Sequence, residues 1–252
     1  MILAGLSPRD GLFNPDGKRI GRTVIVLAVH SSTPSLGVAV TQNGRVLGET
    51  ILVSNHEHLE KLATVIRELT AHLGLNLREI DGFGVAIGPG SFSGIRVGLA
   101  TVKGLALALE KPVAGISSLE ILAWAALESG ESGLPVIDAR RGQVYTACYE
   151  KDGMSLDLVE GPLLLTVDQF FVRARLLSNS IPICEDIDSS MPTQFSNLRN
   201  RQVNVSRPVA CALIAENRFK LGVQDNLHLL APLYVRRSDA EEKRSSYTEE
   251  NR

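Results

Sequence analysis

The chain has 252 residues, of which 44% are hydrophobic and 21% are charged. This length suffices for one large domain or two small ones, and the composition excludes disordered proteins, fibrous proteins and disulfide-dependent miniproteins. The formal net charge is -2, so no overall positive field indicates nucleic acid or anionic lipid as a partner. Three cysteines without a short spacing indicate neither a disulfide framework nor a zinc site. The apolar run at residues 24–29 is too short to span a bilayer, and we expect a cytoplasmic protein with no membrane partner.

The first predicted elements are three strands. Residues 1–22 mix proline and glycine with charged residues and show no period of 2 or 3.6, so we expect a mobile extension there. Residues 24–29 form a continuous apolar run rich in β-branched side chains, which is typical of a strand covered on both faces. Asn43-Gly44, the dipeptide that readily supplies two positive φ angles, is expected to join two further strands, 35–41 and 45–53, in a hairpin.

A helix, a strand and a second helix follow. Ser54 and Glu57 have the spacing of a capping box, and the apolar period of a helix continues from there to Gly74. Residues 81–87 are predicted to form a strand and residues 93–109 a helix. The order of elements in this half is therefore βββαβα.

The same order recurs after residues 130–133, a linker-like run of Gly, Glu and Ser, which suggests a duplication. The second half is expected to have strands at 134–138, 143–149 and 181–184 and helices at 167–177 and 209–221. We therefore predict an α/β chain of two βββαβα lobes, residues 23–130 and 131–237, the second smaller and degenerate. This is the architecture of the actin-like ATPases (the ASKHA fold), which hold ATP between their lobes. A surface excursion is expected at 185–207 and a solvated tail at 238–252.

A glycine-rich turn, residues 88–94, lies between a predicted strand and a predicted helix, where backbone N–H groups and the helix dipole can hold an anion. Its spacing misses the dinucleotide fingerprint because position 93 is Ser, and the chain has no P-loop run. The weak candidates for contact with a cofactor are Gly88, Gly90, Ser91 and the strand-end Asp138. The alternatives are a plain glycine turn with a serine N-cap, and for Asp138 an ion pair or a turn cap.

The helix that follows this turn is nearly bare along one side, because Gly94, Gly98 and Gly104 recur along it. Glycine inside a helix destabilises it by roughly 1 kcal/mol relative to alanine, so a close neighbour should compensate. That neighbour is either the chain's own first helix or a partner as well. Arg96 and Lys103 share a face that could meet a carboxylate or an RNA phosphate, or simply be solvated. No aromatic residue is interleaved with them, which argues against a platform for stacking bases.

We find no catalytic or metal-binding residues in the sequence. His56, Glu57 and His58 do not form a metal motif, because residues two apart do not share a helix face and position 60 is Glu. No serine has an assignable His and Asp partner, so a hydrolase or peptidase is not supported.

Several stretches together identify a family. GPGSFSGIRVG at 88–98 and DARRGQVY at 138–145 resemble the TsaB family of bacterial tRNA threonylcarbamoyladenosine biosynthesis proteins, and the likeness extends through LYVR at 233–236. The resemblance implies a noncatalytic subunit of the complex that installs threonylcarbamoyl on adenosine in tRNAs reading codons that begin with A. In this family the transferase is the partner TsaD, whose metal is held by a His-x-x-x-His pair. The corresponding stretch here, residues 117–122, offers no imidazole.

The resemblance also implies partners. TsaB pairs with TsaD through the two helices of its first lobe, TsaE with ATP is a further partner, and tRNA is bound only within the complex. Self-association through the same face is expected when TsaD is absent. On this basis the expected partner interface comprises Leu59, Leu62, Ile66, Leu69, Gly94, Gly98, Thr101 and Val102.

One departure from the family concerns the end of the first strand, where TsaB proteins usually carry Asp and this chain has His30. A neutral imidazole does not replace a carboxylate as a ligand for a hard cation such as Mg²⁺. We therefore expect no required cofactor and no independent ATP hydrolysis, although contact with ATP or ADP stays open. The alternative is an actin-like small-molecule kinase or ATPase that uses Asp138 and the 88–94 turn.

Overall fold

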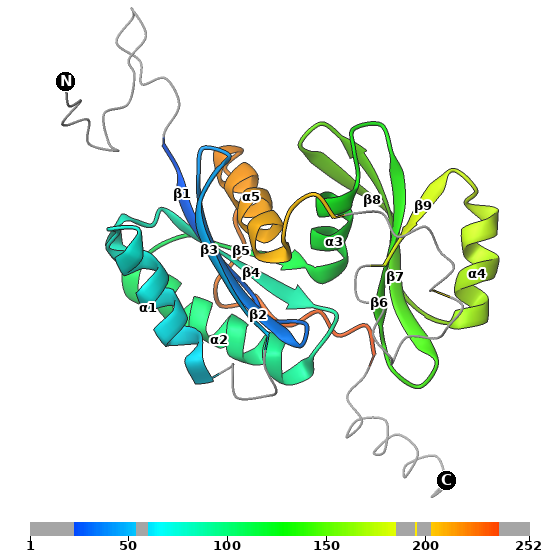
Figure 1. Ribbon diagram of the computed structural model, residues 1–252, viewed down its shortest axis with the longest axis horizontal. Coiled ribbons are helices and arrows are strands. Elements are labelled where there is room, and N and C mark those ends of the chain that lie inside the picture. The colour runs from blue at the N-terminus through cyan, green and yellow to red at the C-terminus, as the bar shows by residue number, and fades with distance from the viewer. Residues whose placement is uncertain (1–22, 54–59, 185–194, 196–202, 237–252) are drawn as a thin grey trace, which may run out of the picture.

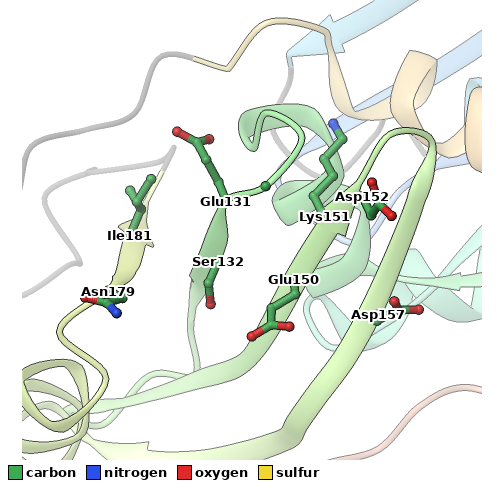
Figure 2. A pocket seen from close by; sticks show the side chains of 9 residues that line it. Glu131, Ser132, Glu150, Lys151, Asp152, Asp157, Asn179 and Ile181 are labelled. Atoms are coloured by element: carbon green, nitrogen blue, oxygen red, sulfur yellow. The ribbon is translucent and has the colours of Figure 1, made fainter.

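The computed structural model describes residues 23–53, 60–184, 195 and 203–236. These residues form two lobes, each built on one sheet (Figure 1). The predicted extension at 1–22, the capping box of Ser54 and Glu57, and the tail at 238–252 lie outside the described residues, as does most of the 185–207 excursion.

The first lobe holds a five-stranded sheet in the order β3-β2-β1-β4-β5. Its strands are β1 (Ile25–His30), β2 (Ser35–Gln42), β3 (Arg45–Val53), β4 (Gly82–Gly88) and β5 (Val113–Ser117). β1 is parallel to β4 and β4 to β5, whereas β2 is antiparallel to both β1 and β3. Every residue of β1 is buried, as its continuous apolar run predicted. The predicted hairpin turn is confirmed, with positive φ angles of 51° at Asn43 and 80° at Gly44.

Helices cover both faces of this sheet (Figure 1). On one face, α1 (Leu62–His72) and α2 (Phe92–Leu109) bury their apolar sides, and the short 3-10 helix η2 (Leu77–Glu79) connects α1 to β4. On the other face lie α5 (Arg207–Lys220) and α3 (Ser118–Ala126). The first lobe is therefore a three-layer sandwich whose α1–α2 layer faces away from the second lobe.

The second lobe holds a four-stranded sheet in the order β8-β7-β6-β9. Its elements are β6 (Ser132–Asp138), β7 (Gln143–Asp152), β8 (Ser155–Thr166), α4 (Val167–Leu176) and β9 (Ser180–Ile183). α4 begins with a capping box in which Thr166 accepts from the backbone of Gln169 and the Gln169 side chain accepts in return. The predicted order of elements recurs here, but its last helix, α5, packs on the sheet of the first lobe. The sequence analysis did not predict β5 or α3, which connect the lobes.

After α5 the chain returns along the first lobe, and residues 224–236 are called the strap below. Its start is tied to β5, since Gly115 N donates to Asp225 Oδ2 at 2.7 Å and Asp225 N donates to Val113 O at 2.9 Å. Lys103 of α2 donates to Leu230 O at 2.9 Å. In Figure 1 the strap runs, in orange to red, from the first lobe toward the second.

Two glycines let α2 approach the end of β1 very closely. A Cβ atom on Gly94 would lie 1.9 Å from Ser31 O, and one on Gly98 would lie 2.3 Å from Ser31 Oγ. The Ser31 hydroxyl donates to Gly94 O at 2.8 Å. Among the described helices α2 alone has the length and hydropathy of a membrane span, and these contacts show that it packs on the sheet as a core helix does. The close neighbour of Gly94 and Gly98 is thus the end of the chain's own β1, and the expectation that it is the first helix is wrong. A Cβ on Gly104 would have no neighbour within 4 Å.

Replacing these glycines tests the close approach. Gly94→Ala should lower the free energy of unfolding by about 2 kcal/mol, because its methyl group meets a backbone oxygen that cannot move freely. Gly104→Ala is the matched control, since a Cβ there has nothing within 4 Å and should raise stability by up to about 1 kcal/mol. Urea denaturation of the two variants checks this, and equal stability changes would contradict the packing described.

Candidate functional site

The apolar faces that the sequence analysis assigned to a partner are turned toward the chain's own sheet. The side chains of Leu62, Ile66, Leu69 and Val102 are exposed by only 1%, 2%, 6% and 0%. They lie in one cluster with residues of β1, β2 and β4. The apolar face of a helix packs first on the sheet beneath it. The helical period of the apolar residues does not show whether a sheet or a partner covers that face.

The other four residues of that predicted interface differ in their surroundings. Gly94 and Gly98 contact Ser31, Thr101 is half-buried, and Leu59 lies outside the described residues. The assignment is corrected accordingly, because a partner that docks on α1 and α2 meets their outer faces instead. That such a partner binds there stays a prediction.

The glycine turn at 88–94 closes on the connection between β1 and β2. A Cβ on Gly90, whose φ is 149°, would lie 2.1 Å from Ser32 O, so only glycine fits there. The backbone N–H of Ser91 donates to Ser32 O at 2.7 Å, and the Ser91 hydroxyl accepts from Gly94 N at 3.3 Å as the N-cap of α2. The turn therefore acts as a packing turn with a serine N-cap. Its Ser91 N–H is not free for a phosphate.

Asp138, the other weak cofactor candidate, caps its own turn. Its Oδ1 accepts from Arg140 N at 2.7 Å, and its Oδ2 lies 3.1 Å from Arg140 Nη1. This is the ion pair and turn cap considered as an alternative to a catalytic carboxylate. Asp138 and the Ser91 N–H are therefore both bonded within the chain, and contact of these residues with a nucleotide stays a prediction.

A group of buried polar side chains, joined by hydrogen bonds, lies at the end of β1, where actin-like folds place their cleft. The His30 ring, 1% exposed, has Nε2 3.1 Å from Ser32 Oγ, and the Ser118 hydroxyl donates to the same oxygen at 2.8 Å. Burial, reinforced by the positive charge of Arg207, lowers the pKa of His30 from 6.5 to about 3. His30 is thus a neutral imidazole buried at the end of β1.

The start of α3 carries an ion pair with α5. Arg218 of α5 donates from Nη2 to Glu120 Oε1 at 2.7 Å and Oε2 at 2.8 Å, and from Nη1 to Gly115 O at 2.9 Å. Burial raises the pKa of Glu120, and the adjacent Arg218 opposes that rise. The stretch 117–122, where the resemblance places the partner's metal site, here fastens α3 to α5. Among the described residues, no group of three or more His, Cys, Asp or Glu side chains is arranged to hold a metal.

An aromatic and arginine cluster that the sequence analysis missed lies where the strap crosses the start of α2. The Arg96 guanidinium lies 3.7 Å from the centroid of the Phe92 ring and donates from Nε to the Tyr234 hydroxyl at 3.0 Å. The Phe92 and Tyr234 ring centroids are 5.5 Å apart. The sequence analysis found no aromatic residue interleaved with Arg96 and Lys103, but it overlooked Phe92, which lies one helical turn before Arg96. Tyr234 is 138 positions away in the chain, and no local spacing could have revealed it.

Comparison with known proteins decides the family. The family described as "TsaD: tRNA N6-adenosine threonylcarbamoyltransferase" matches residues 46–175, about half of the chain. The chain belongs to this family. Its curated relatives include proteins named "tRNA threonylcarbamoyladenosine biosynthesis protein TsaB", 32% identical over 144 residues in Bacillus subtilis and 33% identical over 129 residues in Escherichia coli. Within the TsaD family, it is therefore a TsaB-like member.

These alignments cover only part of each relative. They span 57% and 50% of this TsaB-like chain, and 63% and 55% of the relatives' own lengths. A longer alignment, to an uncharacterized protein of Mycobacterium tuberculosis, is 29% identical and covers 85% of this chain and 93% of that protein. The solved structure of YeaZ from Pseudomonas aeruginosa superposes with a TM-score of 0.67 and 22% identity, over 84% of this chain and 99% of that one. The predicted actin-like fold is thereby confirmed.

His30 gives a prediction on the pH dependence of stability. Below pH 6.5 the unfolded chain binds a proton at His30, whereas the folded chain binds it only near pH 3, so stability falls across that window as the pH decreases. Between about pH 7.5 and about pH 5.5 this contribution is about 1.4 kcal/mol. Urea denaturation at both pH values should show it in the parent but not in His30→Gln. An identical pH dependence in both proteins would contradict the neutral, buried imidazole.

Proposed function

We propose that this TsaB-like chain is a noncatalytic subunit for forming N6-threonylcarbamoyladenosine in tRNAs that read codons beginning with A. The observation that carries the proposal is the 32–33% identity to proteins named for this biosynthesis. In the proposal the chain acts by pairing with a TsaD-type transferase in the cytoplasm. TsaE with ATP is a further partner, and the chain self-associates when the transferase is absent.

The state of three polar groups, His30, Asp138 and Glu120, supports a noncatalytic role. His30 is neutral and bonded to Ser32, Asp138 is paired with Arg140, and Glu120 is paired with Arg218. Each of these groups stabilises the chain's own structure, and a general acid or base must instead reach a substrate. A kinase or ATPase built on Asp138 would first have to break the Asp138–Arg140 pair.

The outer faces of α1 and α2 are the proposed contact surface for the transferase. Exposed small residues lie on both helices, including Ala63 and Ala71 on α1 and Ala100 and Gly104 on α2. The position of Gly104 is open, since a Cβ there would have nothing within 4 Å. Small side chains allow the backbone of another helix to come close, which is why helix pairing through this face fits the residues.

The proposed function is tested by reconstituting the modification with purified components. With the chain, a TsaD-type transferase, TsaE, ATP, an intermediate donor and tRNA present, product should form, and omission of the chain should abolish or strongly reduce it. Mass spectrometry of nucleosides from digested tRNA measures the product. An undiminished yield without the chain would contradict the proposal.

The contact surface is tested by filling its open position. Gly104→Arg should weaken binding of the transferase at least about ten-fold, a change of about 1.4 kcal/mol, because a long charged side chain separates the helices. The variant chain should unfold at the parent's temperature or higher, since arginine favours a helix more than glycine does. Gly104→Ala is the matched control and should bind as the parent does. Parent-like affinity of Gly104→Arg in an isothermal titration would place the interface elsewhere.

A further inference from the structure

The three sequence stretches that carry the family likeness meet at one place in the structure, although they lie far apart in the chain. The 88–98 stretch supplies Phe92 and Arg96, and the 233–236 stretch supplies Tyr234, which contacts both. Two residues further along the strap, Arg236 crosses to the second lobe. It donates from Nη1 to Ala139 O at 2.8 Å and from Nη2 to Gln143 Oε1, in the 138–145 stretch. The strap therefore joins the start of α2 to the turn between β6 and β7.

This junction presents flat rings and guanidinium groups to solvent. Phe92 is 42% exposed and Tyr234 is 47% exposed, and the side chain of Arg140 is 62% exposed. Arg141 is exposed beside it. We call the set the aromatic–arginine surface, and it comprises Phe92, Arg96, Arg140, Arg141, Tyr234 and Arg236.

The turn that carries the two exposed arginines has an unusual backbone. Arg140, Arg141 and Gly142 have consecutive positive φ angles of 62°, 56° and 70°. For residues other than glycine this conformation is unfavourable by roughly 1–2 kcal/mol each, and such strain concentrates at functional positions. Gln143 N donates to Arg140 O at 3.1 Å, and Ala139 N donates to Gln143 O at 3.0 Å, so the turn is held in this form. A structural turn alone would be better served by Asn or Gly at these positions.

The corresponding turn of the first lobe differs from this turn because it is buried. Between β1 and β2, Ser31 and Ser32 are 0% and 2% exposed and bond to the glycine turn. The equivalent turn of the second lobe, between β6 and β7, is exposed and carries arginines. The first turn is buried against the glycine turn, and the second is exposed.

The charge and shape of this surface indicate the class of its ligand. It carries four guanidinium groups, of which that of Arg140 is paired with Asp138, on a chain whose net charge is -2. Arginine forks suit phosphate oxygens, and half-exposed rings suit the face of an unstacked base. The exposed large apolar side chains of this surface are those of Phe92 and Tyr234. Ser91 and Ser93, which flank Phe92 at the start of α2, are polar and exposed. Protein interfaces are also rich in aromatic residues and arginine, so the residue types alone do not separate the two classes of partner. The concentration of guanidinium groups favours a phosphate backbone.

We propose that the aromatic–arginine surface binds single-stranded RNA. Arg140 and Arg141 contact the phosphodiester backbone, and Phe92 with Tyr234 stacks on one unpaired base. Arg96 and Arg236 act as positioning residues, Arg96 by orienting the rings and Arg236 by holding the turn. The proposal rests on the proposed function and deepens it, since it gives this chain its own contact with the loop of the tRNA.

The role of Arg140 and Arg141 is tested by replacing both with glycine, the residue that their backbone conformation favours. Arg140→Gly/Arg141→Gly removes two charges while glycine suits the positive φ angles, so the variant should fold as the parent does. A fluorescein-labelled anticodon stem-loop RNA is titrated with the chain in complex with its TsaD-type partner. The variant should bind at least about ten-fold more weakly, and the magnitude of the slope of log affinity against log salt should decrease by about 1.4. The matched control Arg45→Gln/Arg175→Gln, which neutralises two exposed arginines on other elements, should bind as the parent does.

The rings are tested by separating aromatic character from apolar bulk. Phe92→Tyr should retain RNA affinity, whereas Phe92→Leu should lose roughly ten-fold, since a leucine cannot stack on a base. Equal affinities of both variants and the parent would overturn the stacking assignment. RNA binding that persists in the double glycine variant, with the transferase bound less tightly instead, would assign the surface to an acidic protein and overturn the proposal. Displacement of the RNA by ATP at constant ionic strength would mark a nucleotide site and also overturn it.

The tRNA modification assay keeps this proposal separate from the proposed function. If the double glycine variant binds RNA as the parent does while omission of the chain still abolishes modification, the RNA surface is wrong and the proposed function stands. If omission of the chain leaves modification unchanged, the proposed function fails, whatever the RNA affinities show.

Discussion

The contact between the glycine turn at 88–94 and the β1–β2 connection determines how the rest of the molecule is arranged. Two backbone oxygens, Ser31 O and Ser32 O, occupy the space that side chains at Gly94 and Gly90 would need. Because the turn lies directly on these oxygens, α2 starts against the end of β1 and its Ser91 N–H is already bonded. At the same end of β1, His30 is buried and neutral.

The surfaces that we propose to be functional lie on the outside of the molecule. The inner faces of α1 and α2 form the core of the first lobe, and their outer faces offer small residues to a neighbouring helix. The strap carries Tyr234 and Arg236 across to the other lobe, where the β6–β7 turn is displayed. The proposed protein-binding face and the proposed RNA-binding surface are therefore separate, which suits the proposed role of a subunit that brings a transferase and its RNA substrate together.

Local patterns in the sequence predicted much of the fold, and long-range contacts explain what they missed. Asn43-Gly44 formed the expected hairpin, Ser91 capped α2, and the buried run of β1 took the central position in its sheet. The apolar stripe of α1 was recognised, but its period does not show whether a sheet or a partner covers it. Tyr234 joins Arg96 only through the path of the strap, and α5 joins the first sheet although it follows the second lobe in sequence. Contacts of this kind depend on tertiary packing and leave no local signature.

Hydroxyl-radical footprinting of the chain, free and then bound to its transferase and to RNA, tests most directly whether the two surfaces are separate. The account predicts that the transferase protects His72 and Leu107, exposed on α1 and α2, and that Phe92 and Tyr234 become protected only when RNA is added. Protection of both rings by the transferase alone, or no protection on α1 and α2, would contradict it.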